Sequence, residues 1–157
     1  MGAKQYDECR VFLESYKELR VEEDRLADTI RRLWEQNTRI TARYSGMPGG
    51  GGGESFDSGN VAMGDAIDRA NARYNLMQVR KEEITEFIDG VEGDLNRSIL
   101  RLRYLRMMTW EEISRALSKA GYKLYEERQL RRLHGHALNA ARKHWIDWRR
   151  EWVNWLV

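Results

Sequence analysis

The chain has 157 residues, of which 33% are charged, and it contains one proline and one cysteine. This length predicts one domain, or one domain with an appended arm. No apolar run approaches the roughly 18 residues of a membrane span, and a lone cysteine excludes an internal disulfide. The first residues contain no apolar segment typical of a signal peptide, so we expect a cytoplasmic protein without a membrane partner.

The charged residues behind the net charge of +2 are unevenly distributed along the chain. Residues 1–93 contain 13 Lys and Arg against 18 Asp and Glu, whereas residues 94–157 contain 14 against 7. This asymmetry favours a polyanion as the partner of the C-terminal part. A solvated surface with a chance imbalance would give the same counts, so that alternative stays open.

Two long segments have apolar residues at alternating spacings of four and three, the pattern of a helical seam. With three polar positions included, Glu23, Asn37 and Lys81, the seam positions are Leu19, Glu23, Leu26, Ile30, Leu33, Asn37, Ile40 and Tyr44, and then Met63, Ile67, Ala70, Tyr74, Met77, Lys81, Ile84, Ile88 and Val91. Glu23 and Lys81 are predicted to form an ion pair at the seam. Between them, residues 45–60 include five consecutive glycines, which predict a loop. Residues 1–93 are therefore predicted to form a long antiparallel helical hairpin.

One antiparallel register satisfies both seams at once. It places Leu33 opposite Tyr74 and Ile30 opposite Met77. Mixed Leu, Met and Tyr at helical spacing is typical of packing rather than of a cofactor site. We therefore interpret the seam as core.

From residue 94 the pattern changes to shorter helices. Asp94 is a candidate N-cap for a basic amphipathic helix. Thr109 and Glu112 have the spacing of a capping box, which predicts the start of a second helix that ends before Gly121. A third helix is predicted to begin near Tyr125 or Glu126 and to continue into the last residues.

The outer face of that third helix is rich in side chains that suit DNA. Guanidinium groups bridge phosphates or read guanine bidentately, and amides read adenine. Gly135 on the same side would let a backbone approach closely. The candidate DNA-binding residues are Arg128, Gln129, Arg131, Arg132, His136, Asn139, Arg142 and Lys143.

Residues 99–104, 109–117 and 128–138 together resemble region 4 of bacterial sigma-70 factors, which places its last helix in the major groove of promoter DNA. With residues 45–50, Ser-Gly-Met-Pro-Gly-Gly, the chain also resembles small phage-encoded proteins related to phage late-operon transcriptional activators. The resemblance implies a DNA-binding transcriptional regulator that works in a bacterial host cell, with RNA polymerase as a second candidate partner. The turn between Leu117 and Arg128 is several residues longer than in the sigma pattern.

The last segment, 145–157, contains four tryptophans at spacings of three, four and three. Indoles on one face of a helix bury on the order of 200 Å² each and have to pack on something. Three candidates remain: the chain's own helices, a second copy in a homodimer, or a partner such as RNA polymerase. The candidate interface residues are Trp145, Trp148, Trp152 and Trp155.

The sequence as a whole predicts an all-α fold, with the hairpin followed by a three-helix helix-turn-helix over 94–144 whose last helix extends into the tryptophan tail. His134, His136 and His144 share one helix without carboxylate or cysteine partners at ligand spacing, so no metal site or cofactor is predicted. No nucleophile–base pair or acidic dyad stands out, so we do not expect an enzyme. Two alternatives to a DNA-binding regulator stay open: a protein–protein adaptor that binds RNA polymerase without sequence-specific DNA contact, and a small terminase-like packaging protein.

Overall fold

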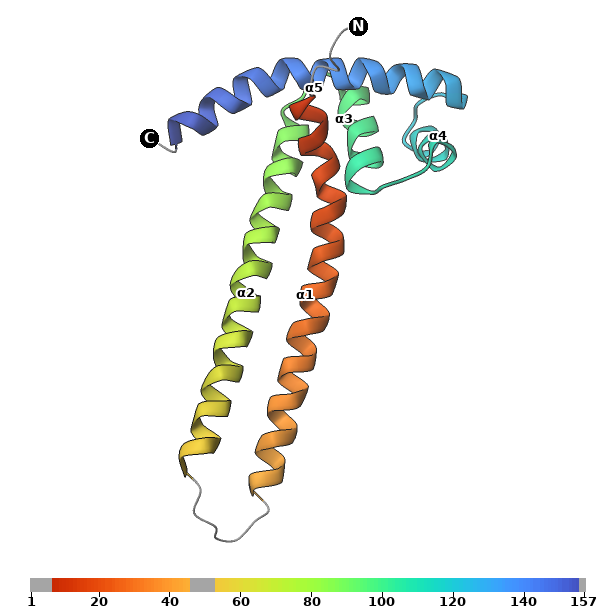
Figure 1. Cartoon of the computed structure of the whole chain (residues 1–157). Coiled ribbons are helices and arrows are strands. Elements are labelled where there is room, and N and C mark those ends of the chain that lie inside the picture. Colours follow the sequence, from red (N-terminus) through yellow and green to blue (C-terminus); the bar gives the residue numbers. More distant parts are fainter. Residues whose placement is uncertain (1–6, 46–52, 156–157) are drawn as a thin grey trace, which may run out of the picture. The chain divides into compact units, whose positions relative to one another are not determined.

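The computed structural model describes residues 7–45 and 53–155, and within these ranges it contains helices and no strand. The predicted all-α class is therefore confirmed. The elements in chain order are α1 (Glu8–Ser45), α2 (Gly53–Asp89), α3 (Asp94–Leu100), a π-helical turn η1 (Arg101–Leu105), α4 (Trp110–Lys119) and α5 (Glu127–Trp155) (Figure 1).

The chain divides into two compact units. Unit 2 comprises Leu19–Arg80, and unit 1 comprises Met1–Glu18 together with Lys81–Val157. The long helices α1 and α2 each contribute to both units, whereas α3, α4 and α5 belong to unit 1.

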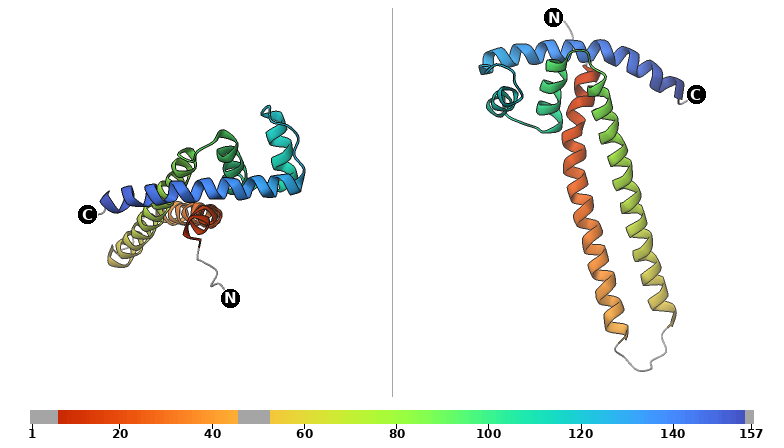
Figure 2. Two further views of the ribbon diagram at one scale, coloured as in Figure 1. Left: turned by 90° about the horizontal axis from the view of Figure 1, so that it is seen from above. Right: turned by 180° about the vertical axis from the view of Figure 1, so that it is seen from behind.

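Unit 2 consists of the longer parts of α1 and α2, which lie side by side and run in opposite directions (Figures 1 and 2). Among its described side chains, Ile67 and Met77 are buried, and both are predicted seam positions. Leu26, Leu33 and Tyr74, also on the seams, are half-buried. One helix covers only one face of the other, so this arrangement leaves a thin core.

The register within unit 2 differs from the predicted one. The Glu23 carboxylate accepts hydrogen bonds from Tyr74 Oη at 3.3 Å and from Gln78 Nε2 at 2.5 Å. Arg73 forms an ion pair with the neighbouring Glu22 at 3.1 Å. Tyr74 was predicted opposite Leu33, so the register is displaced by on the order of one heptad. Two seams with the same period can be displaced by a whole heptad and still bury their apolar faces. The polar pairs distinguish the observed register from the others.

The predicted loop over residues 45–60 was too long. Helix α2 already begins at Gly53, and it ends at Asp89 rather than at Val91. Residues 54–60 contain no proline, so nothing in them blocks the extension of α2 toward its N-terminus. Residues 46–52, which include four of the five consecutive glycines, lie outside the described part of the chain.

Unit 1 is organised around α5. Helices α3 and α4 lie on one side of it and the start of α1 on the other (Figure 2, left). The inner face of α5 presents Leu130, Ala137 and Ala141, which are fully buried at helical spacing. The other fully buried side chains come from α1, α2, α3 and α4 and from the segment that joins α2 to α3: Leu13, Ile84, Phe87, Ile88, Val91, Ile99, Leu100, Ile113 and Leu117.

The start of α3 corrects one predicted detail. Gly93, with φ of 95°, is the residue that precedes the helix, and Asp94 is its first residue. The Asp94 carboxylate forms an ion pair with Arg97 instead of capping the backbone. A glycine occupies this left-handed conformation without the steric cost of a side chain, which explains why the cap lies one residue earlier.

Helix α4 and its connection to α5 are fixed at three points. Thr109 and Glu112 form the predicted capping box at the start of α4. Gly121, with φ of 94°, ends the helix as predicted. The buried Ser114 hydroxyl donates a hydrogen bond to the Tyr125 carbonyl at 2.6 Å. The long turn is therefore fixed to α4, and it sets where α5 begins.

Candidate nucleic-acid interface

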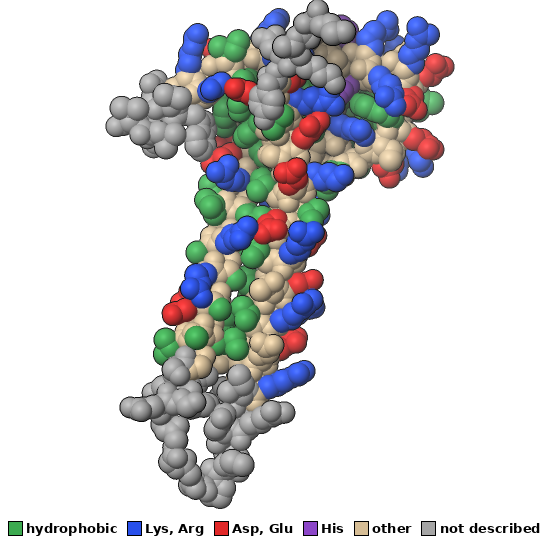
Figure 3. Space-filling model, in the orientation of Figure 1, with side chains coloured by type: hydrophobic (Ala, Val, Ile, Leu, Met, Phe, Trp, Pro, Cys, Tyr) green, Lys and Arg blue, Asp and Glu red, His purple; other side chains and the backbone are tan. Residues whose placement is uncertain are grey.

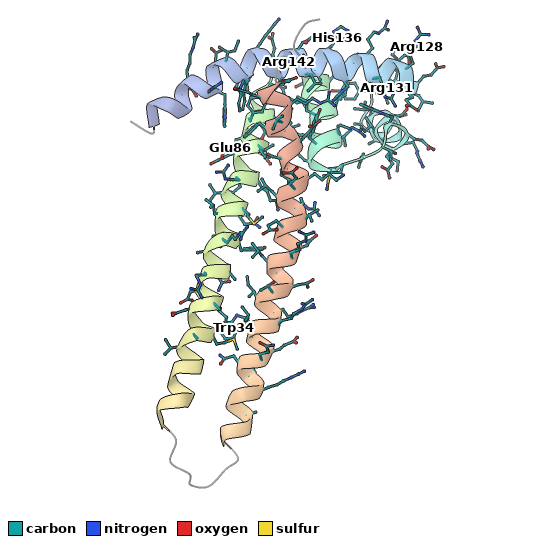
Figure 4. All side chains as sticks on the ribbon, in the orientation of Figure 1. Trp34, Glu86, Arg128, Arg131, His136 and Arg142 are labelled. Atoms are coloured by element: carbon teal, nitrogen blue, oxygen red, sulfur yellow. The ribbon has the colours of Figure 1, made fainter. Side chains whose placement is uncertain are left out.

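A row of polar side chains follows the outer face of α5. Its members are separated by four, four, three and four residues, which places them in one narrow arc of a helix: Arg128, Arg132, His136, Asn139 and Lys143. All five side chains are exposed. Figure 4 labels Arg128 and His136 along α5, and Figure 3 shows the surface of α5 with its cationic side chains. Within the described ranges, Arg128, Arg132 and Lys143 form no ion pair.

Gly135 lies in the middle of this outer row. A Cβ atom built at Gly135 would have no described atom within 4 Å, so the position opens to solvent. Glycine costs about 1 kcal/mol of helix propensity relative to alanine, and packing inside the protein does not require it here. The backbone of α5 is therefore accessible at the centre of the row.

Arg131 lies beside the row and is held in place. Its Nε and Nη2 atoms donate to Glu127 Oε1 at 2.9 and 2.7 Å. Its guanidinium lies 5.6 Å from the ring centre of Trp110, and that of Arg103 lies 4.4 Å from the same ring. These cation–π contacts connect α5, η1 and the start of α4.

Arg142 is also held by contacts within unit 1. Its Nε and Nη2 atoms donate to Asp7 Oδ2 at 3.0 and 2.6 Å, and its Nη1 atom donates to Asn139 Oδ1 at 2.7 Å. The Arg142 guanidinium lowers the pKa of the Asp7 carboxyl, and the Asp7 carboxylate raises the pKa of Arg142. Arg142 is therefore a charged group with a partner, unlike its neighbour Lys143.

Gln129 has a local role at the start of α5. Its side chain is half-buried, and its Oε1 atom accepts a hydrogen bond from the Glu126 amide at 3.0 Å. The structure thus divides the eight candidate DNA-binding residues into two groups. Arg128, Arg132, His136 and Lys143 project outward, whereas Gln129, Arg131, Asn139 and Arg142 make contacts within unit 1.

An aromatic cluster on the other side of α5 fixes the helix to η1. Tyr104 Oη lies 3.0 Å from His134 Nε2, and the His134 ring packs 5.3 Å from that of Trp110. Burial lowers the pKa of His134 to about 4 and raises the pKa of Tyr104 to about 12. At neutral pH the hydrogen bond therefore joins a neutral phenol to a neutral imidazole. This bond positions the helix that carries the outer row.

A groove of about 670 Å³ runs between α5 and the segment that joins α2 to α3. His136, Asn139 and Lys143 form one wall, and Gly90 and Asn96 are part of the other. His144 lies in the same groove and stacks on Phe87 at 5.1 Å between ring centres. Asn96 of α3 and His144 of α5 were not predicted as site residues, because helical spacing within one helix does not show which residues of another helix share its groove.

The tryptophan tail is described in part. The Trp145 ring packs 4.9 Å from Phe12 and 5.6 Å from Phe87, and the Trp148 ring packs 5.7 Å from Phe87. These two tryptophans therefore contact helices of their own chain. The side chains of Trp152 and Trp155 lie outside the described part of the structure, although the helix continues through their backbone.

In the ranges that the structure covers, no three His, Cys, Asp or Glu side chains gather in a way that could hold a metal ion. No helix there is long and apolar enough to cross a membrane. Comparisons with protein-family models, with curated proteins and with solved structures find no match for this chain. The residues and their geometry are therefore the basis of the functional proposal.

Proposed function

We propose that this chain is a DNA-binding transcriptional regulator that contacts double-stranded DNA with the outer face of α5. The observation that carries the proposal is the row formed by Arg128, Arg132 and Lys143, three exposed cations without an ion pair in the described ranges, with Gly135 at its centre. Cations held on one helix face, with a backbone that a ligand can approach, match a phosphate-lined groove.

The surrounding helices support this use of α5. We interpret α3 with η1, α4 and α5 as the three helices of a helix-turn-helix module, in which the last helix enters the major groove. Ile113 and Leu117 of α4 pack in the same core as Leu130 of α5, all three fully buried, so the two helices keep a fixed relation. Arg128 and Arg132 lie near the start of α5, where such helices contact base edges.

The resemblance to sigma-70 region 4 and to phage transcriptional activators adds two further proposals. RNA polymerase is a second candidate partner, and the bacterial host cell is the expected place of action. Unit 2, which we interpret as a helical hairpin, lies outside the DNA-binding module in the sequence and would be free to contact a protein.

One observation favours a protein–protein adaptor as a second candidate function. Leu76 and Val79 lie one turn apart on the face of α2 opposite its seam, and 58% and 50% of their surfaces are exposed. Apolar side chains gathered on one exposed helix face are typical of contact surfaces. This role is compatible with DNA binding, and it would replace DNA binding if no duplex binds.

Fluorescence anisotropy with a labelled duplex at two salt concentrations tests DNA binding. Binding should weaken steeply with salt, because each neutralised phosphate contributes a slope of about −0.9 in log K against log salt. Combining Arg128→Ala with Arg132→Ala should reduce the magnitude of the slope by about 1.8 and weaken binding at low salt.

The matched control combines Arg31→Ala with Arg69→Ala, two exposed arginines of unit 2, and removes the same charge. We expect this control to bind like the unaltered chain. The proposal is wrong if no duplex binds at low salt, or if the control loses as much affinity as the α5 variant.

A further inference from the structure

The first residues of α1 place two carboxylates against two arginines of α5. Asp7 pairs with Arg142 at 2.6 Å, and Glu8 pairs with Arg149. All four residues belong to unit 1 and line one groove of about 630 Å³ beside Trp145. The pairs join positions more than 130 residues apart in the chain.

Arg142 lies at the edge of the outer row of α5. It is three residues after Asn139, to which it donates a hydrogen bond, and it directly precedes Lys143. Its side chain is 45% exposed, and Figure 4 shows it on the same helix as Arg128 and His136. Without its partner, Arg142 would be the fourth cation of the row.

The Asp7 carboxylate offers Arg142 the same chemistry as a DNA phosphate. Both groups are anionic, and both accept charge-assisted hydrogen bonds from a guanidinium. Here one carboxylate oxygen, Oδ2, receives bonds from both Nε and Nη2. We propose that Asp7 is an internal competitor for a DNA phosphate, so that Arg142 joins the DNA-binding surface only when it leaves Asp7. This inference rests on the proposed DNA-binding function.

The strength of the pair suits such a competition. The side chain of Asp7 is 25% exposed and that of Arg142 is 45% exposed. An ion pair with this exposure favours the paired state over the released state only a few-fold. A duplex that presents many phosphates can therefore displace it. Breaking the pair lowers the affinity for a duplex that engages Arg142, whereas a duplex that leaves the pair intact binds without a contact to Arg142.

The two carboxylate oxygens of Asp7 accept different hydrogen bonds, so one substitution can remove one of these contacts and keep the other. Oδ1 accepts a hydrogen bond from the Arg10 amide at 3.1 Å at the start of α1, whereas Oδ2 receives Arg142. Asparagine is as good an N-cap as aspartate but has no charge. Asp7→Asn should therefore preserve α1 and release Arg142.

The test is the affinity of the full chain for a labelled duplex across a salt series. Asp7→Asn should bind about three- to tenfold tighter at low salt, with a slope more negative by about 0.9, because one more phosphate is neutralised. Asp89→Asn is the matched control, since Asp89 is an exposed carboxylate of unit 1 paired with Arg101 at 2.6 Å. The control should change the affinity less than twofold.

A second background separates this competition from a general change in charge. In a chain that already has Arg142→Gln, Asp7→Asn should have no further effect. The inference is overturned if Asp7→Asn leaves affinity and slope unchanged, or if it tightens binding equally in the Arg142→Gln background. In both cases the unaltered chain still binds DNA, so the proposed function stands. If the unaltered chain binds no duplex, both proposals fail together.

Discussion

Unit 1 and unit 2 share the helices α1 and α2 but differ in how well those helices are covered. The ten largest fully buried side chains among the described residues all belong to unit 1, for example Phe87, Leu13 and Ile113. Among the described side chains of unit 2, Ile67 and Met77 are the buried ones. The same kind of heptad pattern therefore gives a thick core where other helices cross it and a thin seam where two helices pack alone.

The two units also differ in what they expose. Unit 2 has nine arginines and nine acidic residues, so it has no net charge. It exposes Trp34, which Figure 4 labels, and Leu76; 53% of the surface of Trp34 and 58% of that of Leu76 is exposed. Unit 1 carries the outer row of unpaired cations on α5. A neutral surface does not attract a polyanion, and this difference is why we propose that unit 1 rather than unit 2 contacts nucleic acid.

Truncating one buried side chain in each unit tests the difference in core thickness. Phe87→Ala should lower the free energy of unfolding by about 3–5 kcal/mol, because the ring is fully buried among Phe12, Trp145 and Trp148. Met77→Ala should cost about 2 kcal/mol, at the low end for this change, because few side chains surround it. Urea unfolding followed by circular dichroism measures both. Equal losses would remove the distinction between the units.

Amide hydrogen exchange tests the same difference without a substitution. Amides in the middle of unit 2, such as those of Leu26 and Met77, should exchange through local openings that cost at least about 2 kcal/mol less than those of Leu130 and Ala137 in α5. Thin cores open before thick ones because fewer apolar contacts have to be exposed. Protection in unit 2 as strong as in α5 would contradict this expectation.

Two glycines give opposite outcomes for the same substitution. At Gly90 in unit 1, a Cβ atom would lie 2.4 Å from Nε2 of His144, whose ring stacks on Phe87. Gly90→Ala should therefore cost about 1–3 kcal/mol through overpacking. At Gly64 in unit 2, a Cβ atom would meet nothing within 4 Å.

Gly64→Ala should instead stabilise the chain by about 0.5–1 kcal/mol, because alanine favours the helix and restricts the unfolded chain. Thermal unfolding of the two variants gives the comparison. A loss of stability at Gly64, or a gain at Gly90, would show that the two surroundings are not as different as the structure indicates.

The sequence predicts most helices because their signals are local. The capping box at Thr109 and the stop at Gly121 need only a few neighbouring residues, and both are confirmed. The register of unit 2 was wrong because whole-heptad slips are equivalent to a periodic pattern. The observed register depends on side-chain pairs such as Glu23 with Gln78, which a periodic pattern does not predict.

The candidate interface shows the same limit. Helical spacing was enough to place Arg128, Arg132 and Lys143 on one outer face of α5. Helical spacing did not indicate that Asp7 would form an ion pair with Arg142, because the two residues are 135 positions apart. Contacts at that separation are set by how helices cross, and a single sequence without related chains contains no signal for them.

The last expected effect appears only in acid, and it concerns unit 1 alone, because all three histidines lie in that unit. Burial lowers the pKa of His134 from 6.5 to about 4 in the folded chain. Between these values the unfolded chain binds a proton that the folded chain does not, so stability should fall as the pH falls through this window.

His134→Phe keeps a ring against Trp110 but cannot bind a proton, so it should flatten the dependence of the unfolding temperature on pH between about 6.5 and 4. His136→Gln, at an exposed position, is the matched control and should leave the dependence unchanged. A slope that persists in His134→Phe would have to come from carboxylates. Asp7 cannot supply it, because its pKa lies below 3.8 in the folded chain and its contribution is lost only under more acidic conditions.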